Sequence, residues 1–481
     1  MNKIGMRNFN MLLGMSFFTL MILLPAPEGM PDAAWSVAAV TALLACWWST
    51  EALPVPITSL LPIVLFPTLG ISSIGAATAP YAAPTIFLLM GGFIMATGLA
   101  RWNLHRRIAL MVLVRVGNSP TALIGGFMAV TAMISMWISN TASTLMMLPI
   151  ALSLASEVVK DRDANTKGFI LCLVLGVAYG ANIGGFGTPI GTPPNLLVVA
   201  FMKDSYGIDV SFLSWMMFGI PAVLVMLPIA CIVLTKLSFP FVLDENSIAQ
   251  DILQSELKEM GRMSVPEKRM ALLFAFIACA WIFRTPIQKN LEMMLWLSDA
   301  LIAIAGAMLM FMIPSGSTKE KHSTLLNWKT ADKIPWGVLL LFGGGLSLAA
   351  AVKSSGLALW IGDELAAIAV FDVIVIIGIL VALVVFLTEL TSNTATVATL
   401  LPILGALSVA TGLDPMILFM PVAISASCAF MLPVATAPNA VVYSSGEVTI
   451  PQMASAGFRI NLFAIFAVTG LCHLLVPIVF G

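Results

Sequence analysis

Long apolar runs separated by short polar segments occupy most of the chain. Three examples are Trp215–Leu234, Ala300–Ile313 and Ile460–Phe480. The first and third reach the roughly 18–20 residues that an α-helix needs to cross a bilayer core. The second reaches that length only if its helix extends back through Asp299 to Leu295. None of these runs alternates with the two-residue period of strands, so the pattern predicts an all-α polytopic membrane protein.

Composition agrees with this prediction. Of the 481 residues, 59% are hydrophobic and 10% are charged, whereas a soluble protein carries about 25% charged residues. The first apolar stretch, from Phe9 to Leu24, follows Lys3 and Arg7 and has no clear small-residue cleavage site after it. We interpret it as a retained helix rather than a cleaved signal peptide. We therefore expect a multi-pass protein of the inner (plasma) membrane.

Candidate chemistry for an enzyme is missing from the sequence. The six cysteines and three histidines are scattered, and no pair has the spacing of a metal or redox motif. No nucleophile stands beside a base. We expect the cysteines to be small packing residues, the chain not to be an enzyme, and nucleic acid not to be a partner.

Three sequence blocks occur twice in the same order, which indicates an internal duplication. Phe87–Gly92 recurs as Leu339–Gly344 at an offset of 252, Ser135–Ala142 as Thr388–Ala395 at 253, and Gly191–Asn195 as Ala435–Asn439 at 244. Internal repeats in a membrane protein are typical of secondary transporters, whose binding site lies at the repeat interface.

The blocks divide the chain into two repeats with a polar segment between them. We expect residues 1–30 to hold the first transmembrane helix, residues 31–243 the first repeat, and residues 269–481 the second. The segment 244–268 is rich in charged residues, and apolar residues such as Ile252 and Leu257 recur among them. This spacing predicts a short amphipathic helix that links the repeats on the cytoplasmic side.

Charge placement predicts the orientation. If the N-terminus is cytoplasmic, only Lys203, Arg284, Lys289 and Lys353 of the 23 lysines and arginines lie outside, as the positive-inside rule favours. The basic loop Lys160–Lys167 is then cytoplasmic. This requires residues 118–157 and 370–410 each to enter and leave on one side, as re-entrant helical hairpins. We expect about 11 transmembrane helices plus these two hairpins, in two inverted-topology repeats, with the C-terminus extracytoplasmic.

Polar breaks interrupt the predicted helices. Ser139-Asn140-Thr141 lies within the first hairpin, Thr192-Pro193-Pro194-Asn195 interrupts the next helix, and Ser392-Asn393-Thr394 and Thr436-Ala437-Pro438-Asn439 repeat the pair. Asparagine, serine and proline favour helix ends over helix interiors. A half-helix that begins after a break presents free N–H groups to a carboxylate, and one that ends before it presents carbonyl oxygens to a cation. A single triplet is equally explained as an interhelical hydrogen-bonding patch, but the paired breaks favour a binding site.

The charges around the breaks indicate which ligands they bind. No lysine, arginine or histidine lies in or near them, so a bound anion must be neutralised by helix ends and by cations. Sodium prefers the oxygen ligands that hydroxyls, amides and carbonyls supply. Glu389 lies in the second hairpin and is interpreted either as a proton relay or, preferably, as solvated or bonded to backbone. Glu51 and Asp299 are expected at helix ends.

These motifs closely resemble the divalent anion/sodium symporter family, the group of INDY-type citrate and dicarboxylate carriers, and the resemblance covers nearly the whole chain. It implies a homodimer in which a transport domain moves as an elevator against a scaffold. It assigns one sodium site to Ser135, Ser139, Asn140 and the Gly191 carbonyl, and the other to Thr388, Thr391, Asn393 and the Ala435 carbonyl. It implies that the substrate carboxylates contact Asn140, Thr141, Thr192, Asn393 and Thr394, with Pro193 and Ala437 lining the pocket.

The preferred hypothesis is sodium-coupled uptake of a C4-dicarboxylate such as succinate. A sodium-independent dicarboxylate exchanger of the same fold is the nearest alternative. A passive anion channel is a different class, and the absence of a basic ring argues against it. The sequence does not separate succinate from malate, citrate, tartrate or sulfate, because pocket volume depends on packing.

Overall fold

The computed structural model of the protein describes residues 3–117, 119–158, 164–243, 248–318, 320, 322–365 and 371–481. Parts of four predicted segments fall outside these residues. They are the first residue of each predicted hairpin (118 and 370), residues 160–163 of the basic loop, and residues 244–247 of the linker.

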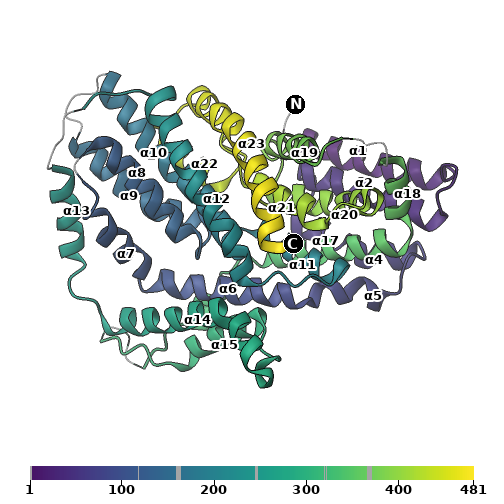
Figure 1. The fold of residues 1–481 in the computed structure, drawn as a ribbon, viewed down its shortest axis with the longest axis horizontal. Coiled ribbons are helices and arrows are strands. Elements are labelled where there is room, and N and C mark those ends of the chain that lie inside the picture. The colour runs from purple at the N-terminus through teal and green to yellow at the C-terminus, as the bar shows by residue number, and fades with distance from the viewer. Residues whose placement is uncertain are drawn as a thin grey trace.

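Helices make up all named elements of the described residues, and one isolated β-bridge joins Pro314 and Thr324. This confirms the all-α prediction. In chain order (Figure 1) the elements are α1 (Lys3–Leu23), α2 (Asp32–Thr50), α3 (Val55–Thr58), α4 (Leu61–Thr68), α5 (Ile74–Thr78), η1 (Ala79–Ala82), α6 (Pro84–Arg101), α7 (Leu104–Leu113), α8 (Pro120–Ser135), α9 (Asn140–Val158), α10 (Ala164–Gly184), η2 (Gly185–Gly187), α11 (Pro193–Tyr206), α12 (Phe212–Ile232), η3 (Val233–Ser238), α13 (Ile248–Glu259), α14 (Val265–Asn290), η4 (Glu292–Met294), α15 (Asp299–Met312), α16 (Trp328–Ala331), α17 (Trp336–Ser354), α18 (Leu357–Leu365), α19 (Val373–Leu387), α20 (Asn393–Thr411), α21 (Pro415–Ser425), α22 (Ala437–Ser444) and α23 (Ile450–Phe480).

Helix length and composition support the membrane assignment. Within the described ranges, nine helical spans are long and apolar enough to cross a bilayer, and five shorter apolar helices accompany them. The predicted eleven crossings and the re-entrant paths stay predictions. The condition under which the run Ala300–Ile313 would reach spanning length is not met, because α15 does not extend back to Leu295. It begins at Asp299, because the side chain of Ser298 accepts a hydrogen bond from the N–H of Leu301 and caps the helix.

Two helical series with the same order of breaks interlock in the centre of the molecule. The first consists of α8, α9, α10, η2 and α11, and the second of α19, α20, α21 and α22. Helix α22 packs against α9 and α10, while α11 packs against α20 and α21. The apolar stretch of α10 is completely buried. The two series therefore meet around α10 and α11 (Figure 1).

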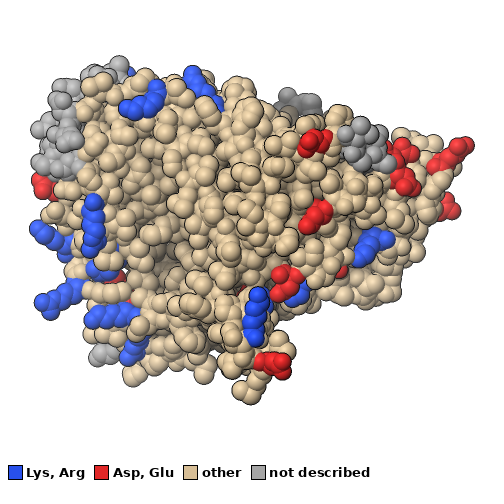
Figure 2. All heavy atoms as spheres, viewed as in Figure 1, with Lys and Arg blue, Asp and Glu red and all other residues tan. Residues whose placement is uncertain are grey.

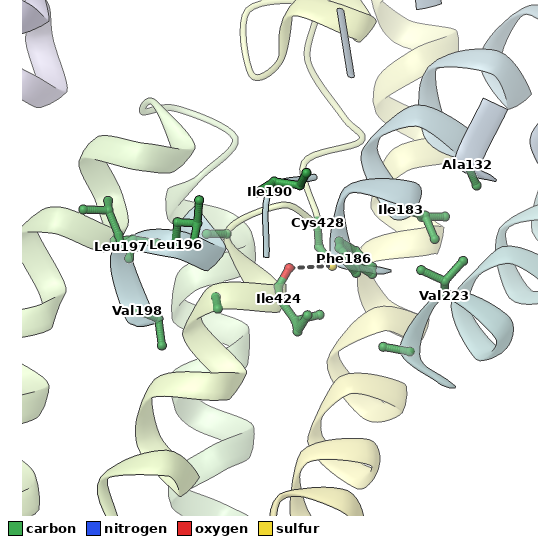
Figure 3. Close-up of a cluster of buried hydrophobic side chains, with 14 of the residues drawn as sticks. Ala132, Ile183, Phe186, Ile190, Leu196, Leu197, Val198, Val223, Ile424 and Cys428 are labelled. Carbon is green, nitrogen blue, oxygen red and sulfur yellow. Dashed lines mark hydrogen bonds between the residues drawn. The ribbon is translucent and has the colours of Figure 1, made fainter. Parts of the chain in front are cut away.

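The apolar core follows the same junction. Figure 3 shows Ile183, Phe186 and Leu196 of the first series close to Ile424 and Cys428 of the second. All five side chains are buried. The thiol of Cys428 donates to the carbonyl oxygen of Ile424 at 3.5 Å, which fits the small packing role expected for the cysteines.

Charged side chains gather at opposite ends of the molecule. Figure 2 shows most lysines and arginines of this face at the end that carries α7 and α13, whereas the acidic side chains lie mainly over the other half of the face, which includes the end that carries α18. Helix α13 confirms the short helix predicted in the linker, and it packs against α7 and α9. This polarity agrees with the bias from which the orientation was predicted.

Buried or half-buried ion pairs join α14 to its neighbours at both of its ends. Near its start, Arg107 Nε lies 2.8 Å from Glu267 Oε1, and both side chains are 7% exposed. Near its other end, Arg284 lies 2.7 Å from Asp299 and 3.2 Å from Asp209. Burial opposes ionisation of Asp209, but Arg284 and then Lys203 outweigh it and lower the pKa of this carboxyl.

We expect Arg107→Leu to lower thermal stability markedly, because it leaves the Glu267 carboxylate buried without a counter-charge. Such a loss costs about 3–5 kcal/mol. Arg107 also donates to the carbonyl oxygens of Gly261 and Met260. The matched control is Arg106→Leu, because Arg106 pairs with Glu256 at a more exposed position. Thermal unfolding of the purified variants should show a large decrease only for the first. Equal melting temperatures would contradict the role assigned to the buried pair.

Candidate functional site

One cavity of about 780 Å³ collects all four polar breaks. All seven predicted substrate residues lie on its wall: Asn140, Thr141, Thr192, Pro193, Asn393, Thr394 and Ala437. Six of the eight predicted cation ligands lie there too: Ser139, Asn140, Gly191, Thr391, Asn393 and Ala435. Residues more than 240 positions apart in the chain thus share one space, as the sequence predicted.

The two remaining cation candidates lie directly behind the wall. The hydroxyl of Ser135, the last residue of α8, lies 2.7 Å from Asn140 Oδ1 and 2.8 Å from the carbonyl oxygen of Ala181. The hydroxyl of Thr388 lies 2.6 Å from Asn393 Oδ1 and 2.8 Å from the carbonyl oxygen of Ala426. The same two acceptors therefore recur at equivalent positions of both series.

These contacts orient the asparagine that begins each second half-helix. Helix α9 begins at Asn140, and Ser139 Oγ accepts a hydrogen bond from the N–H of Ala142. Helix α20 begins at Asn393 after Ser392, whose backbone is extended. Ser139 thus replaces one missing backbone partner at the start of α9, whereas Ser392 forms no side-chain cap at the start of α20. Each break thus directs a helix N-terminus toward the cavity.

The loops before α11 and α22 have matching backbone and side-chain contacts. Thr192 and Thr436 are extended residues at the helix starts, with φ of −145° and −142°. Asn195 Nδ2 donates to the carbonyl oxygens of Gly185 at 2.8 Å and Thr188 at 2.9 Å. Asn439 Nδ2 donates to the equivalent carbonyls of the second loop, at 3.1 and 3.0 Å. Each asparagine closes the loop that precedes its own helix.

Glycine is required in the first loop by close approach. A Cβ atom on Gly191 would lie 2.7 Å from the carbonyl oxygen of Gly185, and one on Gly185 would lie 3.2 Å from the Asn140 amide. These contacts confirm that the glycines before Thr192 allow backbone segments to approach closely. They also bring the backbone of Gly185 close to Asn140 at the first half-helix break.

Sequence reasoning missed the residues that close the cavity from the other side. Ser49, Thr50 and Glu51 at the end of α2, Phe93 of α6, Asn182 of α10, and Pro335 and Val338 near the start of α17 all lie on the wall. Only a weak signal pointed to some of them, since Phe93 and Val338 adjoin the repeated block of α6 and α17. Among the described residues, Glu51 is the charged residue on the cavity wall, and no basic side chain lines the cavity.

Glu389 is bonded to backbone, as the preferred interpretation held. It is 3% exposed and does not lie on the cavity wall. Its carboxylate accepts hydrogen bonds from the N–H groups of Phe430 at 2.7 Å, Met431 at 2.9 Å and Leu432 at 3.2 Å, and from Asn461 Nδ2 at 2.7 Å. Glu51 and Asp299 lie at helix ends as expected.

A helical membrane protein with four interrupted helices around one polar cavity belongs to the class of secondary transporters. The profile described as "Sodium:sulfate symporter transmembrane region" matches residues 6–479, and the chain belongs to this family, the divalent anion/sodium symporters.

Curated relatives and solved structures agree with this assignment. The chain is 40% identical to the sodium-dependent dicarboxylate transporter SdcS of Staphylococcus aureus over 476 residues, covering 98% of this chain and 91% of that protein. It is also 40% identical to SdcS of Staphylococcus saprophyticus, covering 98% and 92%. The fold is similar to the YdaH transporter of Alcanivorax borkumensis (TM-score 0.59, 14% identity, 98% of both chains) and to MtrF of Neisseria gonorrhoeae (TM-score 0.53, 12% identity, 96% and 94%). The chain is thus a multi-pass membrane transporter.

Gly191→Ala should destabilise the cavity wall, because the added methyl group meets a backbone oxygen that cannot rotate away. Overpacking of this kind costs about 1–3 kcal/mol. Gly378→Ala is the matched control, since its nearest contact would be an ordinary 3.7 Å to Thr469. The melting temperature of the purified protein should fall by several degrees only for Gly191→Ala. An unchanged value would show that this loop is wider than the structure indicates.

Proposed function

We propose that this chain is a secondary active transporter that carries a C4-dicarboxylate such as succinate together with sodium ions. One observation carries the proposal: four helix N-termini and two hydroxyl–asparagine pairs surround a cavity whose described wall has no basic side chain. A dianion there needs positive charge from another source. Bound cations supply it, and co-transport follows from that requirement.

The substrate carboxylates are held by the starts of the half-helices. The proposed contacts are Asn140, Thr141, Thr192, Asn393 and Thr394, with Pro193 and Ala437 forming the adjoining wall. Free N–H groups at the starts of α9 and α20 and the threonine hydroxyls donate to the carboxylate oxygens, and the helix dipoles favour the negative charge. The cavity volume lies within the range of about 300–1,000 Å³ usual for small-molecule sites.

Two sodium sites flank the substrate. One uses Ser135, Ser139, Asn140 and the Gly191 carbonyl, and the other Thr388, Thr391, Asn393 and the Ala435 carbonyl. All of these ligands offer oxygen, as a hard monovalent cation requires. Two sodium ions beside a dicarboxylate leave the occupied site neutral, which lowers the cost of holding the charges away from water.

The relatives support the choice of ligands. The two SdcS proteins are sodium-dependent dicarboxylate transporters, and in this chain residues of the four breaks line one cavity. A tricarboxylate such as citrate is the alternative substrate. The proposed location is the plasma membrane, with the N-terminus cytoplasmic and the C-terminus extracytoplasmic, and the separation of charges in Figure 2 supports it.

The movement proposed for the chain is an elevator in a homodimer. The two inverted repeats each contribute one re-entrant hairpin, formed by α8–α9 and by α19–α20, and the two helices after it to a transport domain. Helices such as α6, α14, α15 and α17 belong to the scaffold. The end of α2 and the start of α17 lie on the cavity wall, and both are cytoplasmic in the proposed orientation. The cavity then opens toward the cytoplasm.

Asn140→Ala and Asn393→Ala should each reduce sodium-driven succinate uptake in proteoliposomes at least about tenfold, because each removes an oxygen and a donor that contact charged ligands. Asn290→Ala is the control, since this asparagine lies at the exposed end of α14. Gel filtration should show that all three variants remain folded dimers. Full uptake by either break variant would refute the site.

A sodium gradient alone should drive uptake of labelled succinate into empty proteoliposomes. An exchanger would instead require dicarboxylate inside the vesicle and would ignore the sodium gradient. Removal of sodium should lower the initial rate by more than about tenfold, because the dianion then lacks its counter-charge. Uptake at full rate without sodium would contradict the coupling, and single-channel conductance would favour a passive pore.

A further inference from the structure

Asn182 connects the two halves of the candidate site. It lies on α10 directly after Ala181, whose carbonyl oxygen contacts the hydroxyl of Ser135 in the first cation site. Its side chain is completely buried and it lies on the cavity wall. The residue was not among those that the sequence singled out, and no role in transport follows from the ligand set described above.

The amide group of Asn182 reaches into the second series. Its Nδ2 lies 3.2 Å from the carbonyl oxygen of Ala429, 3.2 Å from Thr436 Oγ1 and 3.3 Å from Asn439 Oδ1. All three acceptors lie in the loop before α22 or in the first turn of that helix. The same loop contains Ala435, the carbonyl ligand proposed for the second cation. Asn182 thus follows a residue of the first cation site in the chain, while its side chain contacts the loop of the second.

Tyr179 adds a second connection in the same direction. It is completely buried one helical turn before Asn182, and its hydroxyl donates to the carbonyl oxygen of Phe430 at 2.8 Å. The rings of Tyr179 and Phe430 also meet edge to face at 5.1 Å. Because Phe430 follows Ala429, the side chains of Tyr179 and Asn182 bind the same stretch of the loop before α22.

The reverse connection is missing at the equivalent positions. The offset that relates Ala181 to Ala426 relates Asn182 to Ser427, whose buried hydroxyl has no hydrogen-bond partner among the described residues. Asn195 Oδ1, the counterpart of the acceptor Asn439 Oδ1, has none either. The loop before α11 is instead held by residues of its own half. Asn195 contacts it, and Trp215 Nε1 donates to the carbonyl oxygen of Phe186 at 2.9 Å. The side-chain hydrogen bonds that run from α10 to the loop before α22 therefore have no counterpart at these equivalent positions.

We propose that Asn182 is a positioning residue that couples the two cation sites, so that sodium bound at the first site orders the second. A cation at the first site immobilises Asn140, the hydroxyl of Ser135 and the adjacent stretch of α10. Asn182 then holds the loop that presents the Ala435 carbonyl, and the cost of ordering that loop is already met when the second ion arrives. Two sites that share such an ordering cost bind cooperatively. This inference rests on the proposed function.

The test measures succinate uptake into proteoliposomes as a function of sodium concentration. The wild-type curve should be sigmoidal. Asn182→Ala should lower the Hill coefficient to the value expected for two independent sites that must both be filled, and raise the half-saturating sodium concentration roughly fivefold or more. The KM for succinate at saturating sodium should change less than about twofold, because Asn182 acts through the cation sites. Ser427→Ala is the matched control and should retain the wild-type curve.

The outcomes separate coupling from a packing role and from the proposed function. Asn182→Leu preserves volume without the donor and replaces the alanine variant if that variant does not fold. A lower maximal rate with an unchanged Hill coefficient would show that Asn182 only packs, and would overturn the inference. An equal effect of Ser427→Ala would also overturn it. Wild-type uptake that ignores sodium would instead refute the proposed sodium coupling itself.

Discussion

The pairing of a hydroxyl with an asparagine carbonyl across each helix break is the interaction on which the site depends. An interrupted helix leaves backbone groups unpaired, and an apolar surrounding gives them no partner. At each break a side-chain hydrogen bond, from Ser135 to Asn140 or from Thr388 to Asn393, joins the end of one half-helix to the start of the next. Since each hydroxyl also reaches a carbonyl of a neighbouring helix, the break is attached to the rest of the fold. The free helix ends therefore face the cavity rather than lipid.

The two halves reach the same geometry with different chemistry. Glu389 occupies the position of Met136, and its carboxylate accepts from three successive backbone N–H groups of the second loop. In the first half the equivalent loop also donates, but through a side chain, because the hydroxyl of Thr188 donates to the carbonyl oxygen of Met136. A buried carboxylate is costly unless it is fully hydrogen-bonded. The hydrogen bonds from the backbone offset this cost for Glu389, and the carboxylate does not lie on the cavity wall.

Prediction from sequence succeeded where the physical cause is local. Clusters of serine, asparagine and proline favour helix ends over helix interiors, so the breaks at Ser139–Thr141 and Thr192–Asn195 and their counterparts were predictable, as was the helix of the linker. The sequence left the start of α15 open, and the cap formed by Ser298 places it at Asp299. The domain boundaries, the number of crossings and the roles of the individual ligands stay predictions.

By itself the sequence determined that this is an all-helical membrane protein of two similar halves whose polar breaks meet. Repetition and residue type carry that information without reference to distant contacts. Only the tertiary structure decided that Glu51 and Phe93 close the cavity, that Glu389 binds backbone, and that Asn182 reaches the second half while Ser427 does not reach the first. These features depend on which segments pack together, and hydrogen bonds between residues some 250 positions apart leave no trace in local composition or periodicity.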